Sequence, residues 1–270
     1  KNAGAKLKIE TAEIGENYLG RIHLAKKLIT LAKKAGADFA KFQSYNEMCL
    51  RKNDPEYDWF KKVALKDSEH KALKKFSIKN KINFLSSPFS LERAKFLCEN
   101  LGLKTIKVAS SKSLDLNLLN YLNKKCNKVY FSTGMLTLQE IKKSISKLNN
   151  VDVSIMHCVS EYPLKIQNAN LLAITKLRQE FLKHEIGYSD HTIGNYAVYT
   201  AVSLGASVIE KHFTINKKLK GTDHILSADF EDLKNIRKNI DQIKTLLGRE
   251  EKKPSRKEKK IKKFMMNRFI

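Results

Sequence analysis

The sequence lacks several features that define common protein classes. Its four cysteines, Cys49, Cys98, Cys126 and Cys158, form no C-x-x-C pair, which argues against a zinc or dithiol motif and predicts reduced thiols in a cytoplasmic protein. No apolar run approaches the roughly 20 residues that a membrane-spanning helix needs, and no signal peptide is visible. No Pro/Gly/Ser-rich linker divides the 270 residues, so we expect one large domain.

Acidic residues are also scarce, with 28 Asp and Glu against 52 Lys and Arg and a net charge of +24. Such a charge suits an anionic partner, either nucleic acid or a phosphorylated small molecule. Much of the excess is scattered, as on a solvated surface, and the rest lies in a basic tail, residues 249–270, that follows a predicted domain of residues 1–248. Aromatic residues are missing from this tail until Phe264 and Phe269, so no specific nucleic-acid site is predicted. We expect residues from Lys252 onward to be unstructured without an acidic partner.

Strand and helix patterns alternate about eight times along the chain, which predicts an α/β fold of the (β/α)8 TIM barrel type. A doubly wound open sheet is the alternative, but no G-x-G-x-x-G follows the first strand. A long loop is expected around Asp54, Pro55 and Trp59. The predicted strands include Leu7–Gly15, Asp38–Gln43, Ile82–Ser87, Thr105–Ala109, Val129–Ser132, Val151–His157 and Ala206–Ile209, and the helices include Ile22–Ala35, Ser68–Asn80, Leu91–Leu101, Asp115–Asn123, Thr137–Leu148, Ala169–Leu182, Asn195–Gly205 and Asp229–Leu247.

Polar residues end all eight predicted strands, where a barrel of this type carries its active site. Capping of single strands does not account for all eight. The set is rich in Lys, Ser and Thr, which bind phosphate through charge and hydroxyl donors. Its members are Glu13, Lys41, Gln43, Ser86, Ser87, Lys107, Ser110, Ser132, Thr133, His157, Ser160, Ser189, His191, Lys211 and His212.

Two of these residues, His191 and His212, end consecutive parallel strands joined by a helix, so their imidazoles are expected to face one pocket. With Asp190 and Glu210 nearby as hydrogen-bond partners, they could form half of a divalent-metal site that substrate or water completes. The alternative is that each histidine only caps its strand. Spacing alone does not choose the metal.

Eight segments carry the pattern of a known family: 12–17, 41–43, 86–90, 107–110, 132–135, 157–163, 187–192 and 210–214. Through these segments the chain resembles the sialic acid synthase family, which includes N-acetylneuraminate, legionaminate and pseudaminate synthases. The resemblance implies a barrel that condenses phosphoenolpyruvate with an N-acylated amino sugar such as N-acetylmannosamine, releasing phosphate and forming a nonulosonic acid. It also implies a homodimer.

The same resemblance implies roles for individual residues. His191 and His212 would bind Mn²⁺ or Mg²⁺ that polarises the sugar aldehyde, and Glu13, Lys41 and Lys107 would complete the catalytic set. The residues around phosphoenolpyruvate would be Lys41, Ser87, Lys107, Ser110, Ser132, Ser160, Tyr162 and Ser189, and those at the sugar would be Glu13, Gln43 and Asp223.

The chain departs from the family pattern at Lys112, where relatives have an acidic residue thought to handle the attacking water. Glu161, Glu16 or the substrate phosphate could take this role. Family members also continue into a small antifreeze-like domain, and this chain ends at Ile270, where the linker to that domain would begin.

Two other functions are alternatives. A related phosphoenolpyruvate-dependent 3-deoxy-ulosonate synthase acting on a phosphosugar would share the lysines and the metal, but it would need a second phosphate site, and no further Arg cluster is present to form one. A catalytically impaired barrel that only binds ligand is the other.

Overall fold

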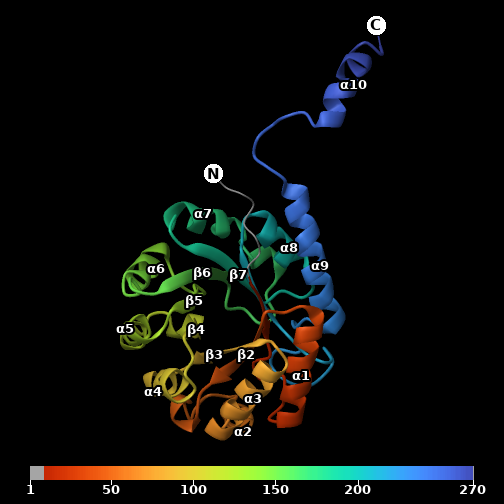
Figure 1. The fold of residues 1–270 in the computed structure, drawn as a ribbon. Helices are drawn as coiled ribbons and strands as arrows, with labels where there is room; N and C mark the ends of the chain where they lie inside the picture. The colour runs from red at the N-terminus through yellow and green to blue at the C-terminus, as the bar shows by residue number, and fades with distance from the viewer. Residues whose placement is uncertain (1–8, 270) are drawn as a thin grey trace.

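The computed structural model describes residues 9–269 and contains an eight-stranded parallel sheet surrounded by helices (Figure 1). The strand order is β3-β2-β1-β8-β7-β6-β5-β4. The two terminal strands of this order, β3 and β4, contact each other, so the sheet closes on itself. The predicted (β/α)8 barrel is therefore confirmed.

The bounds of the elements follow the chain in alternation. The strands are β1 Ile9–Glu13, β2 Phe39–Ser44, β3 Asn83–Pro88, β4 Thr105–Val108, β5 Lys128–Ser132, β6 Asp152–Cys158, β7 Glu185–Asp190 and β8 Val208–His212. The helices are α1 Ile22–Ala35, α2 Tyr57–Val63, α3 Asp67–Lys79, α4 Leu91–Lys95, α5 Leu116–Lys125, α6 Leu138–Ile145, α7 Leu172–Glu180, α8 Tyr196–Ser203, α9 Phe230–Leu247 and α10 Arg256–Met266, with short helical turns η1 Glu47–Cys49, η2 Phe96–Asn100, η3 Ser110–Lys112 and η4 Ile166–Asn168.

The predicted elements agree closely with these bounds, and two helices were missed. Leu7 and Lys8 of the predicted first strand lie outside the described residues. Helix α2 lies in the segment predicted as a loop; it is short, and Val63 is its only buried residue. Helix α10 lies in the tail expected to be unstructured, so that expectation was wrong. A capping box accounts for its start, because Ser255 and Glu258 each bond the other's backbone N–H through their side chains.

The strands separate two groups of side chains, because successive residues of a strand point to opposite faces. The outward group packs beneath the helices in one large core that includes Phe42, Ile106, Phe131 and Tyr188. The inward group forms an apolar floor inside the barrel, made of Phe39, Leu85, Tyr130, Met156 and Val208.

The residues two positions further along the same strands point into the barrel above this floor. Because they lie at the carboxyl ends of parallel strands, they meet at one end of the barrel. They are Lys41, Ser87, Ser132, Cys158 and Glu210.

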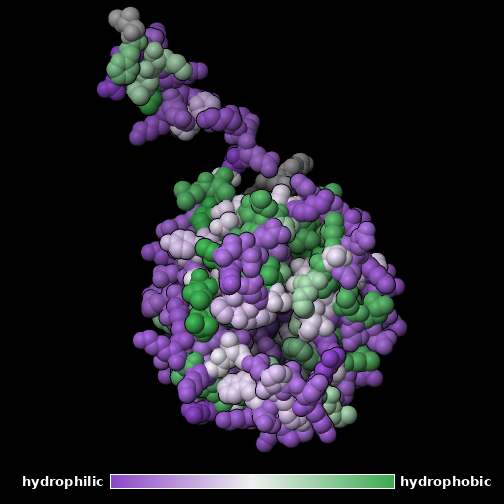
Figure 2. Space-filling view, turned by 180° about the vertical axis from the view of Figure 1, so that it is seen from behind, coloured by the Kyte–Doolittle hydropathy of each residue, from purple (hydrophilic) through white to green (hydrophobic). Residues whose placement is uncertain are grey.

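The C-terminal helices differ in their packing. Helix α9 contacts α1 and α8, whereas α10 stands away from the barrel on an extended segment (Figure 1). Hydrophilic side chains dominate α10, with a hydrophobic patch toward its far end (Figure 2) that includes the exposed Phe264, Met266 and Phe269. None of the helices in residues 9–269 combines the length and the apolar character that crossing a membrane requires.

Candidate active site

A cavity of about 510 Å³ opens at the carboxyl ends of the strands. Every residue to which the family resemblance gives a role lines it, although those residues come from all eight strands and the loops that follow them. They are Glu13, Lys41, Gln43, Ser87, Lys107, Ser110, Ser132, Ser160, Tyr162, Ser189, His191, His212 and Asp223.

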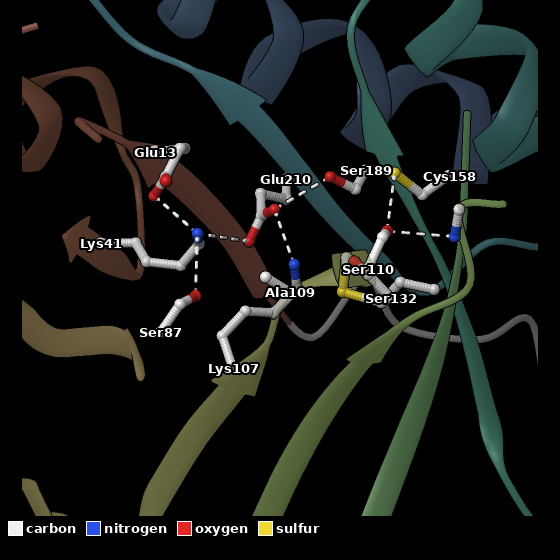
Figure 3. Close-up of polar contacts among 12 residues, drawn as sticks. Glu13, Lys41, Ser87, Lys107, Ala109, Ser110, Ser132, Cys158, Ser189 and Glu210 are labelled. Carbon is white, nitrogen blue, oxygen red and sulfur yellow. Dashed lines mark hydrogen bonds and ion pairs between the residues drawn. The ribbon is translucent and has the colours of Figure 1, made fainter. Parts of the chain in front are cut away.

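Four buried charged residues form a connected group at the bottom of the cavity, which we call the ion ring: Glu13, Lys41, Lys107 and Glu210 (Figure 3). The Lys41 ammonium lies 2.8 Å from the Glu13 carboxylate and 3.6 Å from that of Glu210. Lys107 lies 2.9 Å from the other oxygen of Glu210, which also accepts a 2.9 Å hydrogen bond from the Ser189 hydroxyl. With two cations and two anions, the ion ring has no net charge.

The ion ring stabilises the charged forms of Glu210 and Lys41. Burial alone would raise the pKa of Glu210, but Lys107 and Lys41 hold it well below the usual range. Burial would lower the pKa of Lys41, and the carboxylates of Glu13 and Glu210 raise it instead. Burial raises the pKa of Glu13, against the opposing effect of Lys41. Lys41 is therefore a permanent cation at the base of the cavity.

Serine hydroxyls form a second layer beside the ion ring. The Ser110 hydroxyl accepts a 3.0 Å hydrogen bond from the Gly134 backbone N–H and lies 3.7 Å from the Cys158 sulfur. A Cβ at Gly134 would overlap the hydroxyls of Ser110 and Ser160, so only glycine allows these groups to converge. The Ser132 hydroxyl is buried without a hydrogen-bond partner. These hydroxyls can therefore bind an anionic ligand.

The two histidines face the same cavity, with ring centroids 5.5 Å apart. The Nδ1 of His191 lies 2.7 Å from the Val159 carbonyl, to which it must donate, so in the neutral imidazole the Nε2 is free to accept. The Tyr162 ring covers His191 at a centroid distance of 4.0 Å. The Nδ1 of His212 is buried without a hydrogen-bond partner, and the nearest carboxylate oxygen, from Asp223, is 3.5 Å away.

These features fit a metal site that substrate would complete. Burial lowers the pKa of His212 well below its ordinary value, and the neutral imidazole is the form that binds metal. His191 and His212 can supply two ligands from nitrogen atoms that the protein leaves unpaired. Among the described residues, no group of three or more His, Cys, Asp and Glu side chains is arranged around one point. Substrate or water would therefore provide the remaining ligands.

The predicted hydrogen-bond partners of the imidazoles are wrong. Asp190 faces outward and forms a buried ion pair with Lys211 at 2.6 Å, and it also binds Thr192. Glu210 belongs to the ion ring. Strand alternation explains the position of Asp190, which lies one residue from the inward-facing Ser189, and Glu210 points inward but pairs with Lys41 and Lys107.

Three other polar residues at the predicted strand ends also lie outside the cavity lining. The His157 ring stacks on Tyr188, and its Nε2 bonds the Ala169 carbonyl at 2.9 Å. The Thr133 hydroxyl donates to the Met156 carbonyl. Ser86 is buried on the outward face of β3. These three residues, like Lys211, serve the packing around the barrel.

Several cavity residues were not among those predicted for the site. Glu210 was predicted only as a hydrogen-bond partner of the histidines, although its position two residues before His212 on the same strand gives it the same face as His212. Phe60 comes from α2, which was predicted as loop, and Phe89 comes from the segment after β3. Cys158 lies two residues after Met156 on β6, and only strand alternation placed its side chain on the inward face.

The structure distinguishes between Glu16 and Glu161 as groups that could take the role of the acidic residue that Lys112 replaces. Lys112 does not line the cavity. The Glu161 carboxylate bonds the Asn168 side chain and the Lys165 backbone N–H outside the cavity. Of the two protein groups considered, only Glu16 lines the cavity.

Comparisons with known proteins agree with this geometry. The NeuB family model matches residues 28–252. The N,N'-diacetyllegionaminic acid synthase of Campylobacter jejuni is 38% identical over 269 residues, covering 92% of this chain and 80% of that protein. The pseudaminic acid synthase of Helicobacter pylori is 35% identical, covering 89% of this chain and 75% of that protein. The crystal structure of N-acetylneuraminic acid synthetase from Leptospira borgpetersenii superposes with a TM-score of 0.90 at 30% identity and covers 96% of this chain and 91% of that one.

Proposed function

Because this chain belongs to the NeuB family, we propose that it is a nonulosonic acid synthase. It condenses phosphoenolpyruvate with an N-acylated amino sugar and releases phosphate. In this reaction C3 of phosphoenolpyruvate bonds to the aldehyde carbon of the open-chain sugar, water adds at C2, and the bond between C2 and the phosphate oxygen breaks.

The observation that carries this proposal is the buried set of lysines and serine hydroxyls beside the two histidines in one cavity. Phosphoenolpyruvate brings several negative charges, which require cations and hydroxyl donors. Lys41 and Lys107 supply the cations, and Ser110, Ser132 and Ser160 supply the hydroxyls. The Ser132 hydroxyl has no partner in the protein, so a phosphate or carboxylate oxygen would satisfy it.

The sugar lies on the other side of the cavity in this proposal. His191 and His212 hold one divalent ion, Mn²⁺ or Mg²⁺, which polarises the aldehyde oxygen when bound. Glu13, which accepts a 3.3 Å hydrogen bond from Gln43, and Asp223 bind the sugar hydroxyls. The Tyr162 ring over His191 limits the access of water.

The charge of the lining favours an unphosphorylated sugar. Apart from the two lysines of the ion ring, the described residues that line the cavity include no lysine or arginine. A second phosphate group on the sugar would therefore lack a cationic partner. This argues against the alternative synthase that joins phosphoenolpyruvate to a phosphosugar.

The oligomeric state and the cellular location of the protein are also part of this proposal. We expect two copies of the chain to associate as a homodimer, and we expect the enzyme to work in the cytoplasm, where its free thiols would stay reduced.

Release of inorganic phosphate tests the proposed reaction. Purified protein is incubated with phosphoenolpyruvate and either N-acetylmannosamine or a diacetamido sugar, with and without Mn²⁺. We expect phosphate release that requires both the sugar and the metal, and we expect Lys107→Ala to reduce it strongly. Phosphate release that does not depend on any acceptor sugar, or no release with any of them, would contradict the proposal.

A further inference from the structure

Glu16 differs from Glu13 and Glu210, the two carboxylates of the ion ring, because it has no lysine partner among the described residues. Glu13 and Glu210 pair with lysines, and the Asp223 carboxylate lies 3.5 Å from His212. Within residues 9–269, Glu16 forms no ion pair with a lysine, arginine or histidine, although only 4% of it is exposed. Burial of a carboxyl group without a counter-charge is costly unless other polar groups satisfy it.

Two neutral donors hold the Glu16 carboxyl group in place. The Tyr45 hydroxyl donates to one oxygen at 3.1 Å, and the Trp59 indole N–H donates to the other at 2.8 Å. A carboxylate oxygen has two lone pairs, so each oxygen keeps one for a further partner. Because Glu16 lines the cavity, that partner can be a bound substrate.

The surroundings of Glu16 are acidic and aromatic. Glu56 and Asp223 line the same part of the cavity, and Phe60 lies beside Tyr45 at a ring-centroid distance of 6.0 Å. Burial raises the pKa of Glu16 to about 8, with a smaller contribution from Asp223. The group can therefore be either protonated or ionised near neutral pH.

A hydroxyl group complements this carboxyl group in both states, because a hydroxyl can donate to the carboxylate and can accept from the protonated acid. An ammonium group suits only the carboxylate, and a methyl group suits neither. We propose that Glu16 is a specificity-determining residue that binds a hydroxyl group at the end of the acceptor sugar remote from its aldehyde carbon.

The position of Asp223 supports an orientation of the sugar in which the end remote from the aldehyde carbon reaches Glu16. Asp223 lies next to His212, where the proposed function puts the aldehyde, and it also acts electrostatically on Glu16. A sugar with its aldehyde at the histidines would thus extend past Asp223 toward Glu16. The inference therefore rests on the proposed function for the orientation of the sugar.

The test compares N-acetylmannosamine with its 6-deoxy analogue, in which a methyl group replaces the terminal hydroxymethyl group. The kcat/KM of phosphate release is measured for the wild type, Glu16→Gln and Glu16→Leu, at saturating phosphoenolpyruvate and Mn²⁺. Glu99→Gln is the matched control, because Glu99 is a carboxylate on the outside of the barrel, bonded to Tyr121. Thermal unfolding checks that each variant is folded.

We expect the wild type and the control to prefer the hydroxylated sugar by about 100-fold, because rejection of an analogue that leaves a buried polar group unpaired is strong. Glu16→Leu should reduce the preference to about fivefold or less, chiefly through a higher KM for N-acetylmannosamine, with the KM for phosphoenolpyruvate unchanged. Glu16→Gln, which keeps one acceptor oxygen, should retain most of the preference. A wild-type preference in Glu16→Leu, or no preference in the wild type, would overturn the inference.

A binding measurement separates this inference from the proposed function. Calorimetric titration of the two sugars into wild type and Glu16→Leu, with Mn²⁺ present, requires no turnover. If the wild type binds only the hydroxylated sugar tightly and releases no phosphate, the proposed function fails while the inference holds. Equal binding of both sugars by the wild type, or no binding of either, overturns the inference even if phosphate is released with other acceptors.

Discussion

The replacement of Glu210 by Gln tests the ion ring directly, because it removes one charge and leaves the shape of the side chain unchanged. Lys107 is 3% exposed, and Glu210 is the only carboxylate paired with it among the described residues. Lys41 keeps Glu13 at 2.8 Å. The substitution therefore leaves one buried ammonium group, that of Lys107, without a counter-charge.

Loss of one partner of a buried ion pair costs about 3 to 5 kcal/mol of unfolding free energy. For a chain of 270 residues, about 1 kcal/mol corresponds to roughly 2 °C in Tm. We therefore expect Glu210→Gln to unfold about 6 to 10 °C below the wild type. Phosphoenolpyruvate should recover more of this loss than it adds to the wild type, because its negative charge would take the place of the missing carboxylate beside Lys107.

Asp190→Asn is the matched control for this experiment. It also removes one carboxylate from a buried ion pair, since Lys211 lies 2.6 Å from Asp190, but this pair faces away from the cavity. Both variants should lose stability in thermal unfolding without ligand, and only Glu210→Gln should show the extra gain with phosphoenolpyruvate. Equal gains in the two variants, or wild-type stability of Glu210→Gln, would refute the reasoning.

Three further predictions concern other groups of the cavity. Lys41→Ala and Lys107→Ala should each weaken phosphoenolpyruvate binding by about 2 to 4 kcal/mol in calorimetry, because each removes one partner of a desolvated charged contact; unchanged affinity in both would put the phosphate elsewhere. His191→Ala and His212→Ala should each lower Mn²⁺ affinity at least about tenfold in a direct titration, and wild-type affinity in both would contradict the metal site. The pKa of Glu16, displaced from 4.5 to about 8, means that the folded state retains a proton that the unfolded chain has lost. Unfolding free energy should therefore fall as pH rises from about 5 to 8, by up to about 5 kcal/mol, and the fall should be smaller in Glu16→Gln; parallel pH profiles would contradict it.

The repeated strand and helix pattern was sufficient to predict the barrel and the end of it that holds the site. A barrel of parallel strands brings all eight carboxyl ends together, so polar residues at those ends converge whatever their distance in sequence. The same reasoning predicts that His191 and His212 face one pocket, as they do in the structure. The family resemblance supplied the roles expected of single residues, and those roles stay predictions.

The tertiary structure decided which of two adjacent polar residues enters the cavity. In β8, Glu210 and His212 point inward and Lys211 points outward, although all three are polar and lie at the same strand end. Strand alternation fixes their relative orientation, but the absolute direction depends on how the strand sits in the closed barrel. The partners of the lysines and the isolation of Glu16 depend on contacts between residues far apart in the sequence, such as Lys107 with Glu210 and Glu16 with Trp59. Sequence patterns report local periodicity, so such pairs become visible only when the chain is folded.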